Sequence, residues 1–149
     1  MKTRVLMVCL GNICRSPLAE GILKSKADAE RIEVDSAGTA GYHVGNPPDP
    51  RSVAIAKKYK IDISTQRCRR FSRADFDRFD HILVMDRANY RDVISLAENE
   101  AQREKVRLLL EYTHSGLQEV PDPYYGGDDG FENVYRLIDE ACDRLIEEL

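Results

Sequence analysis

Residues 4–19 of the chain read Arg-Val-Leu-Met-Val-Cys-Leu-Gly-Asn-Ile-Cys-Arg-Ser-Pro-Leu-Ala. The stretch begins with a short apolar run at 5–8, which is typical of a buried strand bounded by a glycine-containing loop. Cys9 follows the run directly, and Arg15 stands six positions after it. The next pair, Ser-Pro, indicates the start of a helix, because proline fits the first helical turn, where its missing N–H costs little. A strand that ends in a thiol, a loop of backbone amides and a helix start favour an anion site that contains a nucleophile.

Apolar residues farther along the chain recur with the spacing of alternating helices and strands. The first helix is expected to reach about residue 29, and further strands are expected at 32–34, 79–85 and 106–110. Helices are expected at 50–59, 87–98 and 131–149, with Asp49 and Asp86 placed to cap the first two of them. Segments 40–50, 60–75 and 121–127 show little periodicity. The alternation predicts an α/β protein, a single-domain doubly wound fold over residues 1–149, whose central four-stranded parallel sheet is flanked by helices on both faces.

The composition is that of a globular protein of 149 residues, a length that suits one domain with a real core. Hydrophobic residues make up 42% and charged residues 32%, which argues against a disordered or fibrous chain. There are 22 Lys+Arg against 26 Asp+Glu, and no basic block suggests a nucleic-acid surface. Any attraction for an anionic substrate must therefore be local.

Targeting and redox signals point to the cytoplasm. The apolar run behind the first four residues is shorter than a signal-peptide core, and no stretch approaches the roughly 20 apolar residues of a membrane span. The cysteines at 9, 14, 68 and 142 show no pairing rhythm, so reduced thiols are expected. No extended apolar surface stripe is visible, which favours a monomer.

Cys9 could be an ordinary buried cysteine, since most cysteines at strand ends are. Its surroundings favour another interpretation. Ligands of parallel sheets bind beyond the carboxyl ends of the strands, and the loop amides, the helix start and Arg15 all stabilise a thiolate there. Five residues between Cys9 and Arg15 can encircle a tetrahedral anion, with Gly11 and Asn12 tolerating tight or left-handed backbone. A nucleotide-binding P-loop would need Gly-Lys-Ser/Thr next, which is absent, so a phosphatase with a covalent phosphocysteine is the better hypothesis.

Residues 9–20, Cys-Leu-Gly-Asn-Ile-Cys-Arg-Ser-Pro-Leu-Ala-Glu, resemble the signature of low-molecular-weight protein tyrosine phosphatases. The resemblance continues in the same order through 35–39, 45–51, 75–76, 79–80, 82–86 and 122–126. It implies the parallel-sheet fold predicted above and hydrolysis of phosphotyrosine without a metal or another cofactor. The implied partner is a phosphotyrosine-containing protein or peptide, with no nucleic acid and no membrane.

The resemblance also implies roles for single residues. Asp122 would be the general acid for a phenol leaving group, although Pro-Asp-Pro by itself predicts only a turn. Ser36 would support the loop together with Asn12, and Ser16 would either assist the Cys9 sulfur or cap the helix. The catalytic set is therefore Cys9, Arg15 and Asp122, and the phosphate-binding loop contributes Leu10, Gly11, Asn12, Ile13, Cys14 and Ser16.

The walls of the cleft follow from the same resemblance. Ile13, Tyr42 and Tyr124 match positions beside the phenol ring, and isoleucine at 13 favours tyrosine over arginine as the phosphorylated residue. Cys14 would either pack in the loop or form a reversible disulfide with Cys9 under peroxide. The three histidines, His43, His81 and His114, are expected at the surface or in loops.

Two other functions remain open. An arsenate reductase shares this fold and loop but passes the reaction to closely spaced additional cysteines, whereas here only Cys68 and Cys142 remain. A phosphotyrosine-binding module without turnover could dispense with Cys9 and Asp122, which this chain retains. The cluster of Arg67, Arg69, Arg70 and Arg73 is expected to be a solvated face, with docking of an acidic partner as the alternative.

Overall fold

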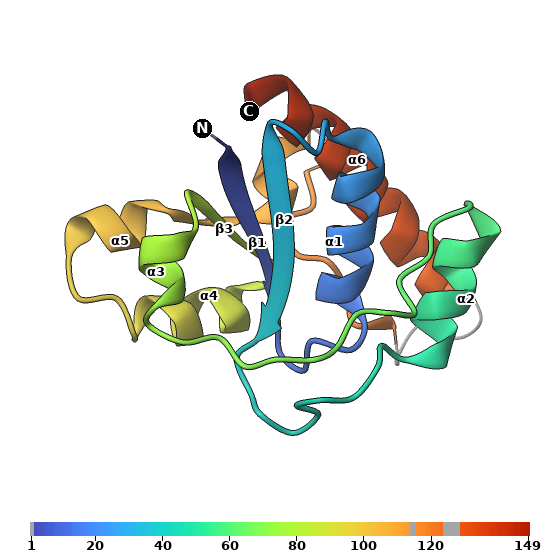
Figure 1. The fold of residues 1–149 in the computed structure, drawn as a ribbon, viewed down its shortest axis with the longest axis horizontal. Helices are drawn as coiled ribbons and strands as arrows, with labels where there is room; N and C mark the ends of the chain where they lie inside the picture. Colours follow the sequence, from blue (N-terminus) through green and yellow to red (C-terminus); the bar gives the residue numbers. More distant parts are fainter. Residues whose placement is uncertain (1, 114–115, 124–128) are drawn as a thin grey trace.

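The computed structural model describes residues 2–113, 116–123 and 129–149 (Figure 1). Four strands form one sheet in the order β2-β1-β3-β4, and every pair in it is parallel. The strands are β1 Thr3–Cys9, β2 Ile32–Gly38, β3 His81–Val84 and β4 Val106–Leu108. The predicted four-stranded parallel sheet is thus confirmed. Strand β2 runs to Gly38 instead of residue 34, whereas β4 stops at Leu108 because a 3-10 helix, η1 Leu109–Tyr112, follows it.

Helices cover both faces of the sheet, as predicted (Figure 1). The long helices α1 Arg15–Lys26 and α6 Gly130–Glu148 lie on one face, and α2 Pro50–Lys58 packs beside them. The helices α3 Asp75–Arg78 and α4 Arg87–Ile94 lie on the other face, with α5 Glu100–Glu104 leading into β4. The chain is therefore doubly wound, with β1 buried between two helical layers.

The helix caps explain where several helices begin. Asp49 accepts a hydrogen bond from Arg51 N at 2.8 Å, and Asp86 accepts one from Asn89 N at 2.8 Å, so both predicted caps are confirmed. The short helices α3 and α5 were not predicted, because four or five residues are too few to show a 3.6-residue period. Helices α1 and α4 also end earlier than their apolar patterns indicated, at Lys26 and Ile94.

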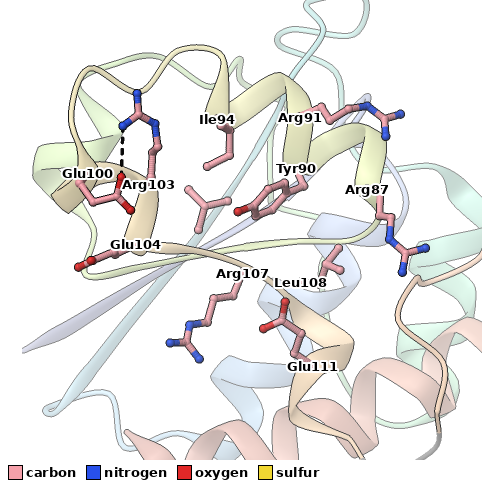
Figure 2. A pocket seen from close by; sticks show the side chains of 11 residues that line it. Arg87, Tyr90, Arg91, Ile94, Glu100, Arg103, Glu104, Arg107, Leu108 and Glu111 are labelled. Carbon is pink, nitrogen blue, oxygen red and sulfur yellow. Dashed lines mark hydrogen bonds and ion pairs between the residues drawn. The ribbon is translucent and has the colours of Figure 1, made fainter.

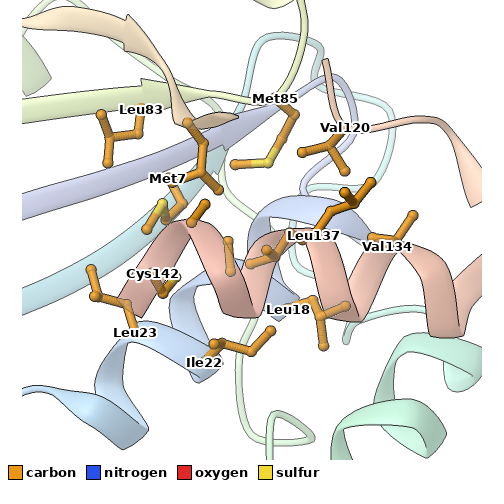
Figure 3. Close-up of a cluster of buried hydrophobic side chains, with 14 of the residues drawn as sticks. Met7, Leu18, Ile22, Leu23, Leu83, Met85, Val120, Val134, Leu137 and Cys142 are labelled. Carbon is orange, nitrogen blue, oxygen red and sulfur yellow. The ribbon is translucent and has the colours of Figure 1, made fainter. Parts of the chain in front are cut away.

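Strand β1 alternates between two hydrophobic clusters. Val5, Met7 and Cys9 face the cluster beneath α1 and α6, whereas Leu6 and Val8 face the cluster beneath α3 and α4. Figure 3 shows the first cluster, in which apolar side chains of β1 and β3 meet those of α1 and α6. Since β1 is covered on both faces and paired on both edges, its last residue, Cys9, is held at a rigid position.

The loops that follow β1 and β2 lie at the opposite end of the sheet from the start of β1 and the end of α6 (Figure 1). This is the carboxyl end of the parallel strands, where ligands of such sheets bind. None of the helices in the described residues is long and apolar enough to span a membrane.

Candidate active site

The loop after β1 turns back on the sulfur of Cys9. Asn12 N donates to Cys9 Sγ at 3.3 Å, and Ser16 Oγ lies 3.0 Å from the same sulfur. Asn12 adopts the left-handed conformation that the sequence predicted for this loop, with φ 55°. Gly11 is not in that region; its small size matters instead, because a Cβ there would lie 3.2 Å from the ring of His43.

A buried hydrogen-bond network holds the loop in this shape. Asn12 Nδ2 donates to Ser16 Oγ at 2.8 Å and to Ser36 Oγ at 3.0 Å. Ser36 Oγ in turn donates to Glu20 Oε1 at 2.6 Å. Because Ser16 Oγ accepts from Asn12, its own proton can point toward the Cys9 sulfur. The sequence analysis assigned Glu20 no role, although its position four residues after Ser16 places both on one face of α1.

Arg15 is anchored from two sides. Its Nη1 donates to Asp86 Oδ2 and to the Val120 carbonyl, each at 2.8 Å. Burial alone lowers the pKa of Arg15, but its interactions with Cys9, Asp86 and Asp122 raise that pKa, so the guanidinium stays charged. Asp86 was predicted only as a helix cap, and its second function was missed because residues 15 and 86 are far apart in the sequence.

Val120 also places the segment that carries Asp122. Its N–H donates to Met85 O at 2.8 Å, just beyond β3, while its carbonyl accepts from Arg15. The two backbone bonds fix residue 120 beside the end of the sheet, and Asp122 follows two positions later. This is how a residue from the far end of the chain reaches the loop after β1.

A cavity of about 180 Å³ lies above the loop and brings these groups together. Tyr42 forms an exposed part of its wall, and His43 packs edge-on against Tyr42, with ring centroids 6.5 Å apart. His43 lies in a turn, as expected, and it also forms part of the cavity wall, which the sequence did not indicate. Tyr124, predicted in the cleft, lies outside the described residues. The lining residues are Cys9, Leu10, Gly11, Ile13, Cys14, Arg15, Tyr42, His43 and Asp122.

The other thiols differ from Cys9 in their surroundings. Burial raises the pKa of Cys14 to about 12, only partly offset by a hydrogen bond from Ser52 Oγ at 3.2 Å. Burial likewise raises the pKa of Cys68 to about 11, and its Sγ donates to Asn12 O. Cys142 lies in the core. All four cysteines are in the described part of the chain and carry free thiols, so the disulfide between Cys9 and Cys14 stays a prediction, to be checked by mass spectrometry after mild peroxide treatment.

A larger cavity, of about 930 Å³, lies between α4, α5 and β4. Figure 2 shows that its apolar floor is surrounded by arginines and glutamates whose charged ends point in different directions. Arg103 is paired with Glu100 within α5, and neither cysteine nor histidine is among the residues that line the cavity. The smaller cavity, which contains a nucleophile, an arginine and a carboxylate, is therefore the candidate active site.

Known proteins resemble this chain over nearly its whole length. The model of the family described as low molecular weight phosphotyrosine protein phosphatase matches residues 4–149. A low molecular weight phosphotyrosine protein phosphatase of Schizosaccharomyces pombe is 43% identical over 143 residues, which cover 91% of this chain and 90% of the relative. The crystal structure of YfkJ from Bacillus subtilis superposes with a TM-score of 0.91 at 39% identity, covering 99% of this chain and 94% of that one. A protein tyrosine phosphatase structure from Entamoeba histolytica gives a TM-score of 0.92 at 36% identity, covering 99% and 96%. A match of this extent, in both sequence and fold, shows that the chain belongs to the low molecular weight phosphotyrosine protein phosphatase family.

Proposed function

We propose that this protein hydrolyses phosphotyrosine monoesters of proteins or peptides, with Cys9 as nucleophile, Arg15 as phosphate ligand and Asp122 as general acid and base. The observation that carries the proposal is the single cavity that these three side chains line, although they are distant in the sequence.

In the first step, Cys9 Sγ attacks phosphorus in line with the ester oxygen. The S–P bond forms while the P–O bond to the phenol breaks, and Asp122 gives its proton to the departing oxygen. A phenol has a pKa of about 10, so protonation helps it to leave at neutral pH. Arg15 and the loop amides bind the equatorial oxygens as charge develops on them.

In the second step, water attacks the phosphocysteine and Asp122 takes a proton from it. The S–P bond breaks, inorganic phosphate leaves and the electron pair returns to sulfur. Ser16 Oγ, 3.0 Å from Cys9 Sγ, is placed to donate a hydrogen bond to the departing thiolate. Residues of this loop thus supply the nucleophile of the first step and also stabilise the thiolate that departs from phosphorus in the second step.

The cavity wall supports an aromatic phosphate ester as substrate. Ile13, Tyr42 and His43 present apolar or flat surfaces around the opening, against which a phenol ring can pack. Cys68 and Cys142 do not support the arsenate reductase alternative, because the Cys68 thiol is engaged with Asn12 O and Cys142, on α6, is buried in the core.

The test is phosphate release from a phosphotyrosine peptide in the presence of EDTA. We expect turnover by the parent protein, none by Cys9→Ser, and a large loss in Asp122→Ala. The Asp122→Ala loss should shrink with 4-nitrophenyl phosphate, whose more acidic phenol needs less proton transfer. Turnover that survives in Cys9→Ser would contradict the mechanism, and tight peptide binding without release would indicate a binding module.

A further inference from the structure

One arginine of the basic segment 67–73 is not the solvated residue that the sequence suggested. Arg69 Nη1 and Nη2 donate to the two oxygens of Asp75, each at 3.1 Å, and Ser72 N donates to the same carboxylate at 2.9 Å. The Asp75 side chain is fully buried. A carboxylate in such a place is stable only when it is paired and hydrogen-bonded, so this two-pronged contact fixes the position of Arg69.

The backbone of Arg69 lies against the phosphate-binding loop. Arg69 N donates to Asn12 Oδ1 at 3.0 Å, and Arg69 O accepts from Gly38 N at 2.9 Å. Figure 1 shows the segment between α2 and α3 passing the carboxyl end of β2 at this point. The neighbouring Cys68 Sγ donates to the Asn12 carbonyl, so two consecutive residues of the segment hold Asn12.

The bond from Arg69 N decides which way the Asn12 amide faces. An asparagine side chain has one acceptor end and one donor end, and Arg69 N takes the acceptor end. The donor end must therefore face Ser16 and Ser36, as it does at 2.8 and 3.0 Å. That orientation leaves the Ser16 proton available to the Cys9 sulfur.

We propose that Asp75 and Arg69 are a positioning pair for the phosphate-binding loop: the buried ion pair fixes the Arg69 backbone, which orients Asn12 and through it the hydrogen bonds to Cys9. The proposal rests on the proposed function, in which Cys9 is the nucleophile of this loop. The proposal gives the Asp75-Phe76 motif, which had no role in the sequence analysis, a positioning function for the catalytic loop.

The test compares Asp75→Asn and Arg69→Lys with a matched control, Val106→Ala. Val106 belongs to the same hydrophobic cluster as Phe76 but lies on the edge strand β4, which β3 separates from β1 and its loop. All proteins are assayed well below the lowest Tm of the set. We expect kcat to fall about tenfold in both pair variants, less than the ~100-fold that a 1 Å misplacement can cost. The inhibition constant of inorganic phosphate should rise by a similar factor, while Val106→Ala lowers Tm but keeps both constants within twofold.

A second readout does not depend on turnover. The alkylation of Cys9 by iodoacetate at neutral pH should be slower in the pair variants, and inorganic phosphate should protect it less. If inorganic phosphate slows the alkylation of Cys9 in a parent protein that has no phosphatase activity, the proposed function fails. In that case the alkylation of the variants still tests the positioning pair. If Asp75→Asn does not fold, Arg69→Lys carries the test. Unchanged kcat, phosphate inhibition and alkylation in a folded pair variant, or an equal loss in Val106→Ala, would overturn the proposal.

Discussion

Asn12 connects more of the candidate site than any residue with a direct chemical role. Its N–H reaches the Cys9 sulfur and its Nδ2 reaches two serines, while Oδ1 and the carbonyl accept from Arg69 and Cys68. A buried polar network is stable only when its members are satisfied, and here the left-handed backbone of a single asparagine satisfies this one. The geometry around Cys9 therefore depends on contacts that begin outside the loop.

At this scale, Ser16→Ala tests the hydrogen bond to sulfur. A hydrogen bond to a charged group contributes about 1.5–3 kcal/mol, so kcat should fall about 10- to 100-fold. If the bond assists the departing thiolate, phosphocysteine hydrolysis slows most, and rapid mixing should show a burst of phenol before the steady state. Ser95→Ala, which removes an exposed serine at the end of α4, serves as the control. A Ser16→Ala enzyme with parental kcat would contradict this role.

Asp86 has two functions that one substitution can separate. Asn is as good a helix cap as Asp, so Asp86→Asn should leave the free energy of unfolding within about 0.5 kcal/mol. The bond to Arg15 loses its charge, which costs about 1 kcal/mol, or about fivefold in kcat/KM. Urea denaturation and steady-state kinetics measure the two effects. A large loss of stability with unchanged kcat/KM would show that Asp86 acts only as a cap.

At the scale of elements, periodicity predicted all four strands and the longer helices, because β1 and β3 are buried on both faces and α6 carries one long apolar stripe. The two aspartate caps could also be predicted from the sequence, since each aspartate stands directly before a helical pattern. Helices α3 and α5 were not, because a single turn leaves no period in the sequence. The end of β2 was missed because Asp35 and Ser36 interrupt its apolar pattern.

The candidate site, too, could be predicted from the sequence only in part. Cys9, Arg15 and the loop between them could be predicted because their spacing is local. The contacts of Arg15 with Asp86 and of Asn12 with Arg69 join residues that are 71 and 57 positions apart, and no local pattern reports them. The place of His43 in the cavity wall could not be predicted either. Its ring fits there because Gly11 has no side chain, and this contact leaves no pattern in the sequence.

Gly38 links two elements, the end of β2 and the loop after β1. A Cβ at residue 38 would lie 2.8 Å from Leu10 O and 3.0 Å from Gly11 C, so Gly38→Ala must displace the loop. We expect a loss of about 1–3 kcal/mol in the free energy of unfolding and at least about a tenfold weaker inhibition by inorganic phosphate. Gly41→Ala is the control, because its Cβ would meet nothing closer than 3.5 Å. Equal effects of the two substitutions would argue against the close approach.

At the scale of the whole molecule, the net charge of -4 cannot attract a phosphate ester. In the proposed function, the attraction arises at one end of the sheet, where Arg15, the loop amides and the start of α1 lie together. The same fold keeps other thiols neutral: burial raises the pKa values of Cys14, Cys68 and Cys142. The four cysteines of the chain thus lie in four different environments.

This arrangement predicts how the stability of the protein depends on pH. The pKa of Cys14 is raised from 9.0 to about 12 by folding, so the folded protein keeps a proton that the unfolded chain releases. The contribution of Cys14 to stability is complete below pH 9 and is lost as the pH rises toward 12, by at most about 1.4 kcal/mol per pH unit. Cys14→Ala removes this dependence. Urea denaturation under reducing conditions, from neutral pH upward past pH 9, should show the parent losing stability relative to Cys14→Ala. Leu18→Ala, in the helix that follows Cys14, removes no titrating group, so the stability that it costs should not change with pH. A stability difference between parent and Cys14→Ala that is constant across this range would show that Cys14 is not buried as a neutral thiol.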